Sequence, residues 1–176
     1  MVFTVSFPVV SINNVTINGK SFTWTLISRR TVHRAGTRMF KRGLDNEGNA
    51  GNFVETEQIV EYENSRCSLV QIRGSIPLVW TQLPNLRYKP PPKLTPGVNQ
   101  MEAFKKHIDQ LIDYGKISII SLINHTGQEL ILEKALTSIV TNFNELFLKY
   151  ESFDFHHECS RMRWDRLSIL MKRIEN

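Results

Sequence analysis

The sequence predicts an α/β fold in which a mixed sheet combines N-terminal antiparallel hairpins with C-terminal βαβ units. Three observations support this prediction. Residues 9–80 alternate apolar and polar side chains with the period of two that half-buried strands show. A proline-rich stretch at residues 84–97 then interrupts the pattern, and residues 99–176 place apolar side chains at helical spacing between short apolar runs. Strands that alternate with helices imply right-handed crossovers and parallel pairing.

The first hairpin is expected around Asn18-Gly19. Residues 11–17 and 20–28 flank this dipeptide, which accepts the positive φ angles of a type I′ turn. A second strand pair is expected around residues 45–49. Its strands would contain Met39 and Phe40 on one side and residues 53–60 on the other, and two further short strands are expected at residues 67–72 and 76–80.

The second half of the chain is expected to alternate helices and parallel strands. The five prolines of residues 84–97 predict an extended surface connection, because proline removes backbone donors and blocks helices. Apolar spacing from Met101 predicts a helix that closes at Gly115. The apolar run at residues 117–123 predicts a strand covered on both faces. Further helices are expected at residues 129–148 and 157–174, with a strand at 150–155 between them.

Composition and charge exclude several classes of protein. With 41% hydrophobic and 22% charged residues, the chain is neither disordered nor collagenous. No apolar run reaches the roughly 20 residues that span a bilayer, so no transmembrane segment is expected, nor is a secretory leader. The net charge of +5 is compatible with nucleic acid, anionic lipid or phosphate ligands and decides nothing alone. No nucleic-acid partner is expected, because no base-reading module is recognisable. Two cysteines form no disulfide framework, which fits a reducing compartment.

Polar residues follow both predicted parallel strands. Residues 124–127 and 156–158 lie at the carboxyl ends of these strands, the edge at which open α/β sheets bind ligands. His156-His157-Glu158-Cys159 also suggests a metal site, but neighbouring histidines cannot both turn to one ion. We therefore favour a polar strand end, and expect no metal and no cofactor.

Cys67 and Arg73 have the Cys-x5-Arg spacing of the cysteine phosphatases. In such enzymes the thiolate attacks phosphorus and the arginine binds the equatorial oxygens. A phosphate loop needs inward backbone N–H groups, glycine and a following helix. The residues between Cys67 and Arg73 contain no glycine and alternate like a strand, and Pro77 follows. We therefore favour a strand, with an active phosphatase that uses Cys67 as the minor alternative.

Six segments occur together in a fixed order: residues 17–20 with 26–30, Arg34-Ala35-Gly36-Thr37-Arg38, residues 48–60, residues 71–77, residues 80–90, and residues 153–168. In this order they resemble the Sac-domain (suppressor-of-actin) phosphoinositide phosphatases, over residues 9–170. The nearest resemblance is to the endoplasmic-reticulum/Golgi member that acts on phosphatidylinositol 4-phosphate. The whole chain, 1–176, would then be a partial Sac domain, with an antiparallel region at 9–80, a connection at 84–97 and a βαβ region at 99–176.

The resemblance implies a phosphocysteine mechanism on the cytosolic face of endoplasmic-reticulum and Golgi membranes. The family nucleophile lies in a Cys-x5-Arg-Thr loop of a form that this sequence lacks, and family order places that loop soon after Asn176. We therefore expect a fragment that is truncated at both ends, that is inactive by itself, and that is soluble or aggregated in the cytoplasm.

Charge and placement identify four candidate binding residues for the phosphoinositide headgroup of an anionic membrane. Between residues 29 and 42 the chain carries basic side chains and no acid, which suits either a solvated strand edge or an anion site. The alternative to a phosphatase fragment is a non-catalytic phosphoinositide- or membrane-binding module. The candidate residues are Arg34, Arg38, Arg73 and Lys89.

Overall fold

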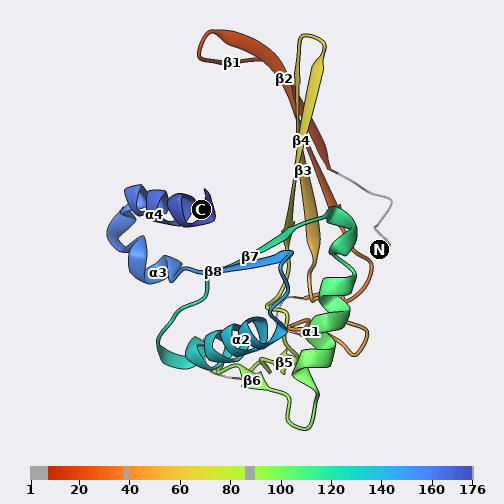
Figure 1. The fold of residues 1–176 in the computed structure, drawn as a ribbon, viewed down its shortest axis with the longest axis vertical. Helices are drawn as coiled ribbons and strands as arrows, with labels where there is room; N and C mark the ends of the chain where they lie inside the picture. The colour runs from red at the N-terminus through yellow and green to blue at the C-terminus, as the bar shows by residue number, and fades with distance from the viewer. Residues whose placement is uncertain (1–7, 38–39, 86–89, 176) are drawn as a thin grey trace.

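The computed structural model describes residues 8–37, 40–85 and 90–175, and its largest element is a four-stranded antiparallel sheet (Figure 1). Each strand pairs with the next along the chain, and the sheet extends as a long ribbon away from the helices α1 and α2 (Figure 1). The strands are β1 (Val9–Ile17), β2 (Lys20–Arg30), β3 (Val54–Tyr62) and β4 (Ser65–Arg73).

The predicted first hairpin is confirmed. Asn18 and Gly19 have φ angles of 50° and 75°, so both central residues of the turn lie in the left-handed region that a type I′ turn requires. The register places Trp24 of β2 opposite Ile12 on one side and Val60 on the other, so one face of the sheet is largely apolar.

The opposite face of the sheet carries a polar network. Arg29 contacts Glu55 at 2.6 Å and Glu57 at 2.8 Å. Glu55 is only 6% exposed and also accepts a hydrogen bond from the Tyr114 hydroxyl of η1 (Ile112–Tyr114). Burial and the Glu55 carboxylate raise the pKa of Tyr114, so the phenol keeps the proton that it donates. This network joins the sheet to the segment that follows the first helix.

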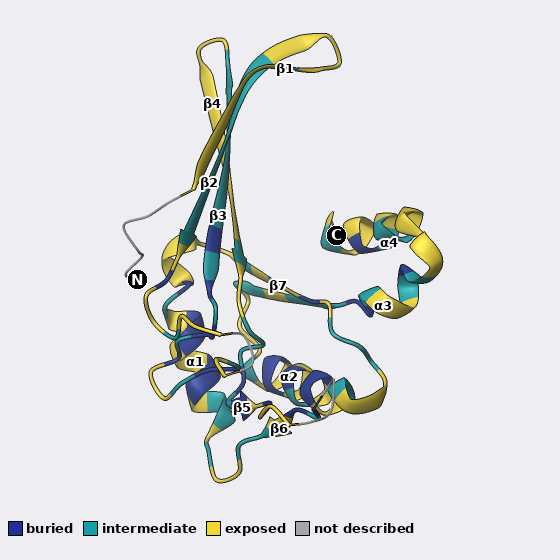
Figure 2. Ribbon diagram, turned by 180° about the vertical axis from the view of Figure 1, so that it is seen from behind, coloured by how far each residue is buried: buried dark blue, intermediate teal, exposed yellow. Residues whose placement is uncertain are grey.

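The main hydrophobic core lies around the helices rather than on the four-stranded sheet (Figure 2). Helices α1 (Gln100–Asp109) and α2 (Leu130–Phe143) pack with the segment around Leu78 and Trp80. The Phe104 and Phe143 rings meet edge to face at 5.4 Å. Two short strands, β5 (Trp80–Thr81) and β6 (Lys93–Leu94), pair beside this core.

A parallel strand pair and short helices complete the structure. Strands β7 (Ile117–Ser121) and β8 (Leu148–Ser152) pair in parallel and are joined through η2 (Gly127–Glu129) and α2, so they form the predicted βαβ unit. Helix α2 is followed by the C-cap residue Asn144, which has a left-handed φ of 44°. The chain continues through α3 (Phe155–Glu158), η3 (Ser160–Met162), η4 (Trp164–Arg166) and α4 (Leu167–Glu175).

Between β2 and β3, residues 43–52 form a tightly packed segment that we call the glycine loop. The carbonyl of Gly48 accepts a hydrogen bond from the buried His107 ring of α1 at 2.9 Å. Burial lowers the pKa of His107, so this ring is neutral and donates from Nδ1. At Gly51, a Cβ atom would lie 2.1 Å from the carbonyl oxygen of Lys41. The loop therefore fits its site only with glycine at this position.

The predicted α/β fold class is confirmed, but several predicted elements differ from the structure. In the described residues the antiparallel and parallel strands lie in separate sheets. Phe40 lies in a turn rather than a strand, and Met39 lies outside the described residues. Of residues 76–80, only Trp80 is in a strand, because Pro77 has no N–H to donate to a ladder.

Three further predictions were wrong for identifiable reasons. Strand β7 is not covered on both faces, since Ile120 is 42% exposed and the burial along the strand alternates. The helix predicted over residues 157–174 is interrupted, because Arg161 and Met162 adopt left-handed φ angles of 56° and 59°. The proline-rich connection is not wholly on the surface. Pro90 is buried, and its carbonyl accepts a hydrogen bond from Gln82.

Candidate functional site

A cavity of about 350 Å³ lies between the glycine loop and the strand β5. Arg34, Arg42 and Trp80 are among the residues that line it. Asp45 and Glu47 also line it, so the cavity is not purely cationic. Asp45 is already engaged within the loop, where its Oδ1 accepts the backbone N–H groups of Glu47 and Asn49.

Arg34 is held at the cavity by the backbone around it. One of its Nη atoms donates to the carbonyl of Arg42 at 2.7 Å, and its own carbonyl accepts from the N–H of Asn52 in the glycine loop. Its Nε is buried and has no hydrogen-bond partner among the described residues. The Arg42 guanidinium lies 5.5 Å from the centre of the Trp80 ring. An anion in the cavity would therefore lie beside two arginine side chains.

The four candidate residues do not form one group in the described part of the chain. Arg34 lines the cavity. Arg73 is exposed at the end of β4, opposite Val54, and does not line the cavity. Arg38 and Lys89 lie outside the described residues.

The Cys-x5-Arg pattern lies in a regular strand. Cys67 and Arg73 both belong to β4, and the residues between them pair continuously with β3. Six residues of strand span roughly 20 Å, so the thiol and the guanidinium cannot both contact one phosphate group. The structure supports the rejection of Cys67 as a phosphatase nucleophile.

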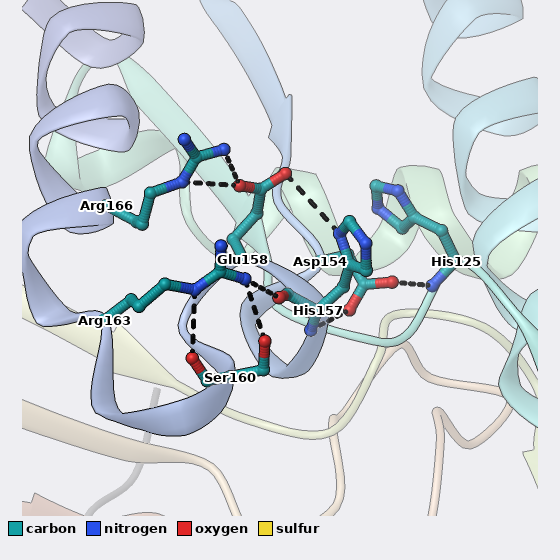
Figure 3. Close-up of polar contacts among 7 residues, drawn as sticks. All are labelled: His125, Asp154, His157, Glu158, Ser160, Arg163 and Arg166. Atoms are coloured by element: carbon teal, nitrogen blue, oxygen red, sulfur yellow. Dashed lines mark hydrogen bonds and ion pairs between the residues drawn. The ribbon is translucent and has the colours of Figure 1, made fainter.

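A second polar cluster lies at the carboxyl ends of β7 and β8, where the sequence predicted a ligand-binding edge (Figure 3). Asp154 joins the two strand ends, because its carboxylate accepts the backbone N–H of His125 at 2.9 Å and that of His157 at 3.1 Å. Burial opposes ionisation of Asp154, but these two hydrogen bonds outweigh it and the pKa of Asp154 is lowered. The carboxylate is therefore a fixed anchor for both turns.

Ion pairs order the segment after this anchor. Arg166 contacts Glu158 at 2.5 Å, and this pairing lowers the pKa of Glu158. Arg163 donates to the carbonyl of His157 and to the Ser160 hydroxyl (Figure 3). The two arginines thus tie the segment after α3 back to α3 and to Ser160. No group of three or more metal-ligating side chains is placed to hold an ion in the described part of the chain.

Comparison with known proteins identifies the family. The model of the SacI homology domain matches residues 1–160. The chain belongs to this family. Relatives of this SacI homology domain include phosphatidylinositol-3-phosphatase SAC1-B of Danio rerio, 48% identical over 98% of this chain. Phosphatidylinositol-3-phosphatase SAC1 of Drosophila melanogaster is 51% identical over 94% of it, and SAC1 of Saccharomyces cerevisiae is 42% identical over 90%.

This SacI homology domain spans 30%, 28% and 26% of the lengths of those three relatives. The predicted resemblance to Sac-domain phosphoinositide phosphatases is confirmed by the family match and by these identities. None of the helices that the structure describes combines the length and apolar character needed to cross a bilayer.

Sequence reasoning missed the role of Asp154 in this SacI homology domain. Asp154 is the N-cap of α3, and it also fixes the turn after β7. An aspartate directly before a helical segment is an N-cap signal that the sequence does contain. No local sequence signal indicates the hydrogen bond from the His125 N–H to Asp154, because these residues are 29 positions apart.

Replacing Asp154 with alanine is expected to lower the free energy of unfolding by about 2 kcal/mol, because a cap is lost and the His125 N–H loses its acceptor. Since the folded-state pKa of Asp154 is lowered, its stabilisation is complete above about pH 5 and is lost as the pH falls through that lowered pKa. Urea unfolding of the original chain and of the Asp154→Ala variant at several pH values measures this pH dependence. If the two free energies of unfolding differed by the same amount at pH 7 and at pH 3, the prediction would be contradicted. The exposed Asp109→Ala is the control, with an effect within about 0.5 kcal/mol.

Proposed function

We propose that this chain is part of a phosphoinositide phosphatase and that its own residues bind the phosphorylated inositol headgroup of an anionic membrane. The observation that carries the proposal is its family membership, together with relatives whose names are phosphatidylinositol phosphatases. The arginine-lined cavity supports it, because guanidinium groups suit phosphate oxygens.

Phosphatidylinositol 4-phosphate is the substrate that we propose, on the endoplasmic-reticulum and Golgi membranes that the family resemblance implies. The names of these relatives specify 3-phosphatases, so phosphatidylinositol 3-phosphate is the direct competitor in any test. We assign phosphoryl transfer, by a phosphocysteine route, to a cysteine loop that is not among these 176 residues. Within them, the one Cys-x5-Arg pattern lies along β4.

Vesicle co-sedimentation tests the binding role. The chain is expected to bind vesicles of phosphatidylcholine that contain phosphatidylinositol 4-phosphate more tightly than vesicles that contain phosphatidylserine or phosphatidylinositol 3-phosphate, and added salt is expected to weaken binding. Arg34→Gln should weaken binding about tenfold, because a charged hydrogen bond is lost. Arg73→Gln tests Arg73, the other candidate headgroup-binding residue that the structure describes, in the same vesicle-binding assay.

Arg66→Gln is the matched control, because it removes the same charge from an exposed arginine on β4 that contacts Glu61. Its binding should stay within about twofold of the original chain. Equal binding to pure phosphatidylcholine would overturn the proposal. Equal binding to every anionic vesicle would instead leave a membrane-binding module without headgroup selectivity.

A further inference from the structure

The hydroxyl of Ser152 lies between an imidazole and a buried carboxylate. Ser152 is the last residue of β8, and its Oγ lies 2.5 Å from Oε1 of Glu133 in the first turn of α2. On its other side, the same Oγ lies 2.7 Å from Nε2 of His125, which follows β7. Three elements of the βαβ unit therefore meet at one hydroxyl group.

The Glu133 carboxylate accepts hydrogen bonds from several hydroxyl groups. Glu133 is 8% exposed, and Thr137 and Tyr150 donate to its Oε1 at 3.0 and 3.1 Å, while Ser121 donates to its Oε2 at 3.2 Å. Burial raises the pKa of Tyr150, and the charge of Glu133 adds to this effect, so the phenol keeps its proton for donation. Several hydroxyl donors around one carboxylate solvate its charge in place of water.

This arrangement determines the tautomer of His125. A serine hydroxyl has one proton, and Ser152 donates it to Oε1 of Glu133 at 2.5 Å. Ser152 Oγ can then only accept from the imidazole, so Nε2 of His125 carries a hydrogen. In the neutral ring, Nδ1 consequently has a free lone pair, and Nδ1 has no hydrogen-bond partner among the described residues.

The lone pair belongs to a residue at the edge where open α/β sheets generally bind ligands. His125 belongs to the turn at the carboxyl end of β7, and its backbone N–H is fixed by Asp154 (Figure 3). The ring is thus held at Nε2 and its backbone at N, which leaves Nδ1 as a positioned acceptor. An acceptor of this kind selects a hydroxyl group and disfavours a phosphate dianion, which has no hydrogen to donate at neutral pH.

We propose that the His125–Ser152–Glu133 chain presents Nδ1 of His125 as a hydrogen-bond acceptor for a hydroxyl group of the inositol ring. The inference rests on the proposed function for the identity of the ligand, and on the geometry alone for the tautomer. In this role His125 recognises a hydroxyl of the polyol ring and not its phosphate groups. Ser152 and Glu133 are positioning residues that act through His125.

The tautomer is tested first, without ligand, by long-range ¹H–¹⁵N correlation of the histidine rings at about pH 8, where a typical imidazole is neutral. The original chain is expected to show His125 with hydrogen on Nε2. Ser152→Ala removes the acceptor, so the ring should become a mixture of tautomers. Thr137→Val is the matched control, because it removes another hydroxyl donor to the same Glu133 oxygen and should leave His125 unchanged. A mixture in the original chain would overturn the inference.

The ligand is tested with inositol 1,4-bisphosphate and with inorganic phosphate as soluble probes. The bisphosphate should shift the Nδ1 resonance of His125, inorganic phosphate alone should not, and His125→Leu should weaken bisphosphate binding roughly fivefold to tenfold. The control His156→Leu changes an exposed ring that only packs against Phe155 and should bind normally. If inorganic phosphate shifted the Nδ1 resonance of His125 as much as the bisphosphate does, the inference would be overturned. It would also be overturned if the bisphosphate caused no shift in a chain that binds phosphoinositide vesicles. In both cases the proposed function would stand. Failure of every probe and vesicle would overturn the proposed function as well.

Discussion

Replacing Gly51 with alanine is expected to lower the free energy of unfolding by about 3 kcal/mol, the upper end of the usual range for overpacking. The new Cβ would lie 2.1 Å from the carbonyl oxygen of Lys41, which is backbone and cannot rotate away. Relief by moving residue 51 is also costly, because its N–H donates to Gly43 and its carbonyl accepts from Ser75. Urea unfolding measures the change. Vesicle binding should fall as well, since the displaced loop lines the cavity beside Arg34.

Gly74→Ala is the matched control for this effect. The nearest atom to its new Cβ would be Cβ of Ala50 at 3.4 Å, which is an ordinary contact. We expect its stability to lie within about 0.5 kcal/mol of the original chain, with a small gain from the stiffer unfolded state. If the two alanine variants unfolded at the same urea concentration, the close packing of the glycine loop would be wrong.

Replacing Arg29 with methionine is expected to cost about 3 kcal/mol at neutral pH. The change leaves the buried carboxylate of Glu55 without its cationic partner, and breaking one half of a buried pair leaves an uncompensated charge. Adding Glu55→Gln removes that charge, so the double variant should recover much of the loss. Thermal and urea unfolding of the single and double variants give the coupling between the two side chains.

The exposed pair of Arg66 and Glu61 provides the comparison. Arg66 has a side chain 72% exposed, so Arg66→Met should change stability by less than about 1 kcal/mol. Equal losses from Arg29→Met and Arg66→Met would show that burial of Glu55 does not determine the effect.

Local signals in the sequence predicted the parts of the fold that depend on neighbouring residues. Asn18-Gly19 identified the first hairpin because a type I′ turn needs φ angles that few other dipeptides accept. The apolar spacing after Met101 also located α1, because the buried side chains of this helix recur at helical intervals. The order of strand, helix and strand predicted the parallel pair β7 and β8.

Elements that depend on distant partners could not be predicted in this way. Strand β3 pairs with β2 across the glycine loop rather than with the residues around Phe40, and no local pattern specifies that partner. In the candidate site, charge alone identified Arg34, but Asp154 and Glu133 act through contacts with residues distant in sequence. Their roles follow from the tertiary structure and not from composition or spacing.

The strand order of the four-stranded sheet also determines the sequence of events during folding. Two-residue turns join β1 to β2 and β3 to β4, so these hairpins close without a large loss of chain entropy and can form within microseconds. Pairing β2 with β3 requires closure of the whole segment between Arg30 and Val54, and docking of that segment joins Gly48 to His107, 59 residues away. We therefore expect the two hairpins to form early, and we expect the later step that brings them together to set the rate at which the chain becomes native.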